Sequence, residues 1–128
     1  MRWLTAETAA FGAVFAVATA LSIAAGLFVT ASFFVADRGV AEDYLGFHLA
    51  VSGAFVALGL LLASIAVQAL GLAKYAADFG SGATAPLRMR VSRLLLRLAV
   101  AGLGLCVVLA VILWGILSRI GEGVAVFG

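Results

Sequence analysis

The sequence predicts an all-α integral membrane protein in which three transmembrane helices form one up-down-up antiparallel bundle over residues 1–128. Two observations predict this class. Hydrophobic residues make up 66% of the chain and charged residues 11%, against roughly 45–50% and about 25% in ordinary soluble domains. The charges also border three long apolar runs, which predict a single membrane domain with spans at about 8–36, 44–73 and 94–117.

The run at 44–73 is the clearest span. It contains no Asp, Glu, Lys or Arg, and as a helix it would extend about 45 Å at about 1.5 Å per residue. The hydrocarbon core of a bilayer needs only about 20 apolar residues. A core helix of a small soluble domain would not be apolar on every side for so long, so this run predicts a transmembrane helix.

The run at 8–36 is also uncharged, and it exceeds the roughly 7–15 apolar residues at the centre of a secretory signal peptide. It is therefore expected to remain as the first span. The charged link DRGVAED that follows has the length of the turn in an antiparallel helical hairpin.

The segment 74–93 is the long polar stretch of the chain, and it is predicted to be a cytoplasmic loop between the second and third spans. Gly80 and Gly82 favour an end to the second helix. Pro86 favours the start of the third, because proline lacks the N–H that the first helical turn leaves unpaired. After the third span, Gly121 and Gly123 are expected to end the helix, and the following residues VAVFG to rest at the membrane interface or to fray.

Basic residues predict the orientation, because cytoplasmic loops carry an excess of Lys and Arg. Those on the side shared by the amino terminus and the segment 74–93 are Arg2, Lys74, Arg88, Arg90 and Arg93, with Arg97 just inside the span. The other side holds Arg38 and Arg119. The preference for arginine over lysine indicates GC-rich coding, so we expect a bacterial-type inner (plasma) membrane with a cytoplasmic amino terminus and a periplasmic carboxyl terminus.

His48 is the single histidine and the best candidate metal ligand in the chain. At helical spacing it shares a stripe with Tyr44 and Ser52 near the outer surface. One interpretation is a ligand to haem or chlorophyll, although bis-histidine haem would need a second imidazole from another chain. The favoured alternative is a histidine hydrogen-bonded to a neighbour or to a lipid headgroup. No metal site is predicted, since structural zinc sites use four Cys or His ligands.

Four arginines are the candidate contacts with lipid or a partner: Arg88, Arg90, Arg93 and Arg97. The last three lie at i, i+3 and i+7 and share one helix face, while Arg88 points elsewhere. Attraction to an anionic leaflet is worth about 1 kcal/mol for each residue, more than the roughly 0.3–1 kcal/mol cost against the helix dipole. We expect contact with anionic headgroups, with the carboxylates of a partner protein as the alternative.

Small residues recur at every fourth position and predict close helix packing, which drives association in lipid. The rows are Gly12, Ala16, Ala20 and Ala24; Ala18, Ser22, Gly26 and Thr30; Gly46, Ala50 and Ala54; and Gly102, Cys106 and Ala110. The first two rows lie on different faces of the first helix, which would leave surface for another protein. Gln68 is costly in hydrocarbon unless paired, so we expect it to face another helix. The predicted interhelical packing residues are therefore Gly12, Ser22, Gly26, Gln68 and Gly102.

The chain is predicted not to be an enzyme and not to bind nucleic acid. The stretch GLGLCV at 102–107 lacks the third glycine of a dinucleotide fingerprint, and no GK[ST] phosphate loop is present. The acids lie in loops and termini, where they cannot form a Ser-His-acid triad. The net charge is +2, but the basic residues border membrane spans and do not lie on a solvated domain that could bind nucleic acid.

In size and three-span plan the chain resembles the membrane anchors of succinate dehydrogenase. The stretch SIAVQALGLAKYAADF is similar to the anchor helix in which a haem-ligating histidine is followed downstream by Asp-Tyr. Here Gln68 stands at the position of that histidine and Phe79 at that of the tyrosine, so no haem site is carried over.

These observations predict a non-catalytic accessory or anchor subunit of a larger complex of the respiratory or photosynthetic electron-transfer type. Its expected partners are anionic lipids and larger membrane-protein subunits. The alternative is a self-assembling protein, either holin-like or a homo-oligomeric channel. A channel would place a polar stripe through a whole span, and no span of this sequence shows one.

Overall fold

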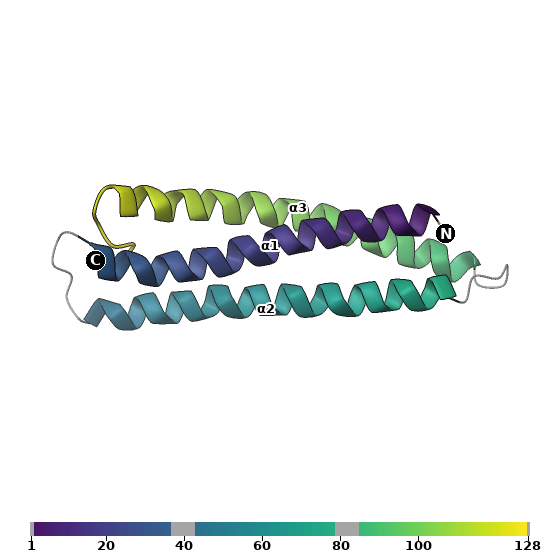
Figure 1. Cartoon of the computed structure of the whole chain (residues 1–128), viewed down its shortest axis with the longest axis horizontal. Coiled ribbons are helices and arrows are strands. Elements are labelled where there is room, and N and C mark those ends of the chain that lie inside the picture. The colour runs from purple at the N-terminus through teal and green to yellow at the C-terminus, as the bar shows by residue number, and fades with distance from the viewer. Residues whose placement is uncertain (1, 37–42, 79–84, 128) are drawn as a thin grey trace.

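The computed structural model describes residues 2–36, 43–78 and 85–127, with side chains described for 8–36, 43–75 and 89–127. Three long helices account for most of these residues: α1 (Arg2–Val35), α2 (Asp43–Asp78) and α3 (Ala85–Gly121). They run up, down and up, so that the start of α1 lies at the same end as the end of α2 and the start of α3 (Figure 1). No strand occurs in the described ranges, and the predicted all-α architecture is confirmed.

Each helix is long and apolar enough to cross a membrane, over Thr8–Val35, Asp43–Tyr75 and Met89–Gly121. The first two agree with the predicted spans to within about two residues, while the third is longer at both ends. Within the segment 74–93 the second helix continues to just before Gly80 and the third begins beside Pro86, as these residues indicated. Since α2 continues to Asp78 and α3 begins at Ala85, just before Pro86, only 79–84 lies outside the described residues.

α1 lies in the middle of the arrangement. It packs against both other helices, whereas α2 and α3 contact each other far less (Figure 1). Its buried side chains belong to Phe11, Phe15, Ala18, Ser22, Ala25, Val29 and Ser32, at spacings that alternate between four and three, and Gly26 is buried beside Ala25. This heptad period is typical of left-handed helix packing. α1 is therefore the central contact of the bundle, and α2 and α3 keep broad outer faces.

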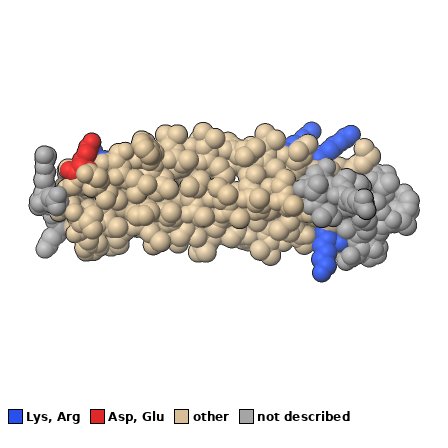
Figure 2. All heavy atoms as spheres, turned by 45° about the horizontal axis from the view of Figure 1, so that its top comes forward, with Lys and Arg blue, Asp and Glu red and all other residues tan. Residues whose placement is uncertain are grey.

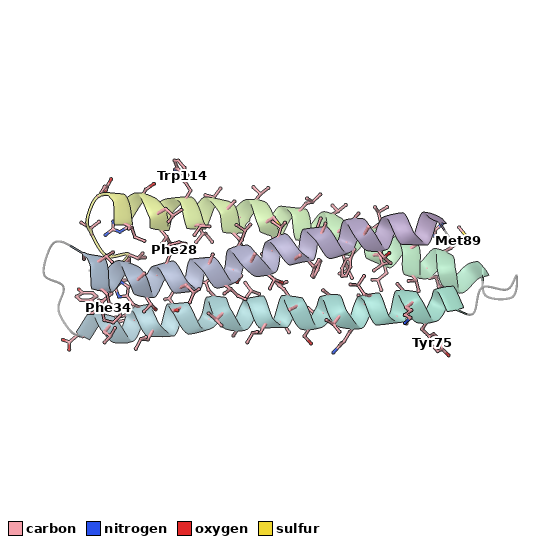
Figure 3. The ribbon with its side chains drawn as sticks, viewed as in Figure 1. Phe28, Phe34, Tyr75, Met89 and Trp114 are labelled. Atoms are coloured by element: carbon pink, nitrogen blue, oxygen red, sulfur yellow. The ribbon has the colours of Figure 1, made fainter. Side chains whose placement is uncertain are left out.

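The outer surface is apolar between the two ends of the bundle. On the face shown in Figure 2, Lys and Arg gather at one end and acidic side chains at the other, with uncharged residues between them. Tyr75 and Trp114 point away from the helices near opposite ends (Figure 3), with 58% and 74% of their surface exposed. Exposed apolar residues between aromatic and charged ends are typical of a protein surrounded by lipid.

Candidate functional site

The contact between α1 and α2 is a close approach of two backbones. A Cβ atom at Gly26 would lie 2.8 Å from the Ser52 carbonyl oxygen and 3.2 Å from Phe55 Cβ. A Cβ atom at Gly59 would lie 2.6 Å from Ile23 Cγ1. Each helix thus supplies a glycine whose lack of a side chain allows the other helix to approach closely. Nearby, the Ser22 hydroxyl donates a 2.6 Å hydrogen bond to the carbonyl oxygen of Phe55.

The contact between α1 and α3 is built around Gly102. A Cβ atom there would lie 2.7 Å from Val14 Cγ1 and 3.1 Å from Phe15 Cε1. One turn later, the Cys106 thiol donates to the Val14 carbonyl oxygen over 3.5 Å. The structure therefore places Ser22 and Gly26 against α2, and Gly102 against α1.

Two sequence expectations about α2 differ from the structure. Gly46, Ala50 and Ala54 lie on the outside, and a Cβ atom at Gly46 would meet nothing within 4 Å. Gly59 makes the close contact instead. Gly59 lies seven residues after Ser52, so the two residues share one face of α2, and this heptad spacing could have indicated Gly59 as a contact residue. Gln68 was expected to face another helix, but its side chain is exposed on the surface of the bundle.

Gly12 lies beside an apolar groove between α1 and α2, where a Cβ atom would lie 3.9 Å from Leu70 Cδ1. The groove has a volume of about 370 Å³. Its walls include Gly12, Ala16, Thr19 and Ala20 of α1, and Ala63, Ala66, Val67 and Leu70 of α2. Ala16 and Ala20 are exposed to the outside along this groove.

His48 forms a buried polar centre near the other end of the bundle. Its Nδ1 lies 2.7 Å from the carbonyl oxygen of Tyr44, and the backbone N–H of Phe127 donates to its Nε2 over 3.2 Å. A backbone N–H can only donate, so Nε2 must accept and the ring proton lies on Nδ1. The imidazole is completely buried and contacts the rings of Phe33 and Phe127, with centroids 5.3 and 5.2 Å away.

The residues after α3 fold back onto this centre. Gly123 has a φ of 75°, and the N–H groups of Gly123 and Val124 bond to the carbonyls of Ile120 and Arg119. This is the Schellman arrangement, in which glycine adopts the left-handed conformation most easily. The sequence predicted a helix end here, but not the course of the tail beyond it.

Residues 124–127, which we call the tail, are fixed by side chains from three helices. Arg119 Nε donates to the Ala125 carbonyl over 2.9 Å, and the N–H of Val126 donates to Ser32 Oγ over 3.1 Å. Ala125 is buried. The tail is therefore docked on the bundle and does not fray, which was one of the two outcomes that the sequence suggested. It covers the ends of α1 and α2 and joins them to α3.

This arrangement engages both ring nitrogens of His48 within the chain. A haem or chlorophyll ligated through Nε2 would have to displace the N–H of Phe127, and ligation through Nδ1 would require loss of the contact with Tyr44. The geometry fits a structural role, in which the buried His48 accepts the partly buried backbone N–H of Phe127 and so holds the tail.

Apart from Arg119, which holds the tail at the opposite end, the described basic side chains lie at the end of the bundle where α1 begins (Figure 2). Arg90, Arg93 and Arg97 are exposed on α3, and Lys74 is exposed on α2. The side chain of Arg88 lies outside the described residues. The end of the bundle that carries these cations is suited to an anionic surface or to acidic side chains of another protein.

None of the known family models, curated proteins or solved structures compared with the chain matches it. What the protein does must therefore be inferred from its own packing and surfaces. The packing includes a buried polar centre that joins three helices, and the surfaces include a cationic end, an open groove and an exposed amide on an apolar helix face.

Proposed function

We propose that this chain is a non-catalytic subunit that anchors or supports a larger membrane complex. The exposed amide of Gln68 carries this proposal. Gln68 lies six residues before Lys74, or about 9 Å along the helix axis, and so within the hydrocarbon region. An amide without a hydrogen-bond partner in such surroundings costs several kcal/mol. Since this side chain is exposed on the surface of the bundle, its partner would belong to another polypeptide.

The shape of the bundle supports the same role. α2 and α3 contact each other little, so their outer faces remain open to a neighbour. Large apolar side chains cover these faces, among them Leu61 and Val67 on α2 and Val107 and Val111 on α3. In lipid, such faces associate through close packing and interhelical hydrogen bonds. The electron-transfer class of the complex is supported by the likeness in size and three-span plan to the anchors of succinate dehydrogenase.

Replacing Gln68 with methionine tests this role, because methionine keeps the length of the side chain and removes the amide. The wild-type protein, extracted in mild detergent, should retain larger membrane proteins in fixed stoichiometry. We expect Gln68→Met to weaken this retention roughly 3- to 15-fold, the range that corresponds to one interhelical hydrogen bond. The measurement is quantitative mass spectrometry of the purified assembly.

Ile65→Met is the matched control, since Ile65 is an exposed apolar residue on the same helix. It should leave retention unchanged. A photo-crosslinker at position 68 identifies the neighbour directly. Crosslinks confined to a second copy of this chain, with no larger protein retained, would favour the self-assembling alternative and contradict the subunit role.

We also propose a bacterial-type inner membrane with the cationic end in the cytoplasm, because cytoplasmic flanks carry the excess of Lys and Arg. Alkaline phosphatase fused after the tail should then be active, and the same enzyme inserted in 79–84 inactive. Combined replacement of Arg90, Arg93 and Arg97 with glutamine should produce a mixture of both orientations. The reverse activity pattern in the unmodified chain would contradict the proposed orientation.

A further inference from the structure

The groove between α1 and α2 is confined to the half of the bundle near the cationic end. At Gly26 the two helices meet with backbone in contact, whereas at Gly12 the nearest atom across the interface, Leu70 Cδ1, is 3.9 Å from a Cβ position. Small residues on both walls, such as Ala16 and Ala63, leave the space unfilled. Tight packing in one half of the bundle and an open groove in the other are therefore features of the same interface.

The length of the groove corresponds to one leaflet. From Gly12 to Ala20 the wall extends about 12 Å at about 1.5 Å per residue. One leaflet contributes about half of the roughly 30 Å hydrocarbon core. Ala16, Ala20 and Val67 are exposed, so the groove is open to the surrounding acyl chains along its length.

Lys74 lies one helical turn beyond the groove wall, toward the cationic end of the bundle. Lys74 follows Leu70 by four residues and Val67 by seven, which places it on the same face of α2 as these two wall residues. It is exposed, and it lies at the end of the bundle that carries the basic side chains (Figure 2). The groove thus leads from apolar walls to a positive charge at the depth of the lipid headgroups.

We propose that this groove is a binding site for one anionic phospholipid, with an acyl chain between α1 and α2 and the phosphate paired with Lys74. A second helix does not fit as well, since a helix with its side chains is about 10–12 Å across, while the walls belong to helices already in contact at Gly26 and Gly59. The site differs from the arginine face of α3, because its charge comes from α2 and its apolar part from α1 and α2.

Native mass spectrometry with palmitoyl-oleoyl phosphatidylglycerol and phosphatidylcholine tests the site. The wild-type protein should retain one phosphatidylglycerol with about a 5-fold preference over phosphatidylcholine, the factor that one lysine near an anionic headgroup supplies. Lys74→Gln should remove this preference. The control Arg93→Gln removes a cation of the arginine face of α3, which does not line the groove and so does not select the lipid held there; this variant should keep the preference.

The apolar part of the site is tested by filling it. Ala16→Phe, at an exposed groove position, should abolish retention of both lipids. Ala10→Phe, at an exposed position of the same helix away from the groove, should retain them. Ala20→Phe makes the same test if Ala16→Phe does not fold. Three outcomes would overturn the proposal. The folded filled variant could still retain one phosphatidylglycerol, or the preference could be lost in Arg93→Gln and not in Lys74→Gln. The third is the formation of disulfide-linked copies by an Ala16→Cys chain that lacks Cys106.

Discussion

Replacing Gly26 with leucine is expected to separate α1 from α2 and to lower the free energy of unfolding by about 3 kcal/mol, at the upper end of the cost of overpacking. A Cβ atom there would lie 2.8 Å from the Ser52 carbonyl oxygen and 3.2 Å from Phe55 Cβ. Neither atom is the end of a flexible side chain, so the helices themselves must move. The displacement would also strain the hydrogen bond from Ser22 to Phe55.

Gly53→Leu is the matched control for this prediction. It makes the same chemical change in α2, where a Cβ atom would meet nothing within 4 Å. Both variants can be unfolded in mixed micelles with increasing denaturing detergent while helix content and Trp fluorescence are followed. Equal stability of the two variants would show that α1 and α2 are not in backbone contact at Gly26.

Replacing His48 with leucine is expected to release the tail. The N–H of Phe127 would lose its acceptor in a partly buried hydrogen bond, which costs up to about 1–3 kcal/mol. The ring contacts of His48 with Phe33 and Phe127 would be lost as well. The amides of Val126 and Phe127 should then exchange hydrogen roughly 5- to 150-fold faster, the factor equivalent to that free energy. Exchange measured by mass spectrometry on carboxyl-terminal peptides reports this directly.

Ser118→Ala is the control for tail release, because the Ser118 hydroxyl donates within its own helix to the Trp114 carbonyl and does not contact the tail. Ser32→Ala, which removes the acceptor of the Val126 N–H, should act in the same direction as His48→Leu. Unchanged exchange in both the His48 and Ser32 variants would contradict the docked tail. A haem or chlorophyll absorption band present in the wild-type assembly and lost in His48→Leu would instead assign His48 to a cofactor.

The spans were predictable because length and charge decide them. Uncharged runs of this size exceed what a bilayer requires, and charged or turn-forming residues border them. Small-residue spacing also pointed to Ser22, Gly26 and Gly102, since close backbone approach tolerates only small side chains. These properties belong to short stretches of sequence and do not depend on which helix lies nearby.

The direction in which each helix face points was decided only by the tertiary structure. In water, burial separates apolar from polar residues. In lipid it does not, because both buried and exposed positions can be apolar: on α1, Val29 is buried and Val17 is exposed. Hydrophobicity therefore does not mark the heptad seam of α1, the contact at Gly59 or the outward face of Gln68. The docking of the tail onto Ser32 and His48 joins residues far apart in the chain. The sequence by itself determined three helices long and apolar enough to cross a membrane, because length and composition suffice for that. Their packing determined which small residues meet and which polar groups bond within the chain, because these contacts join residues far apart in the sequence.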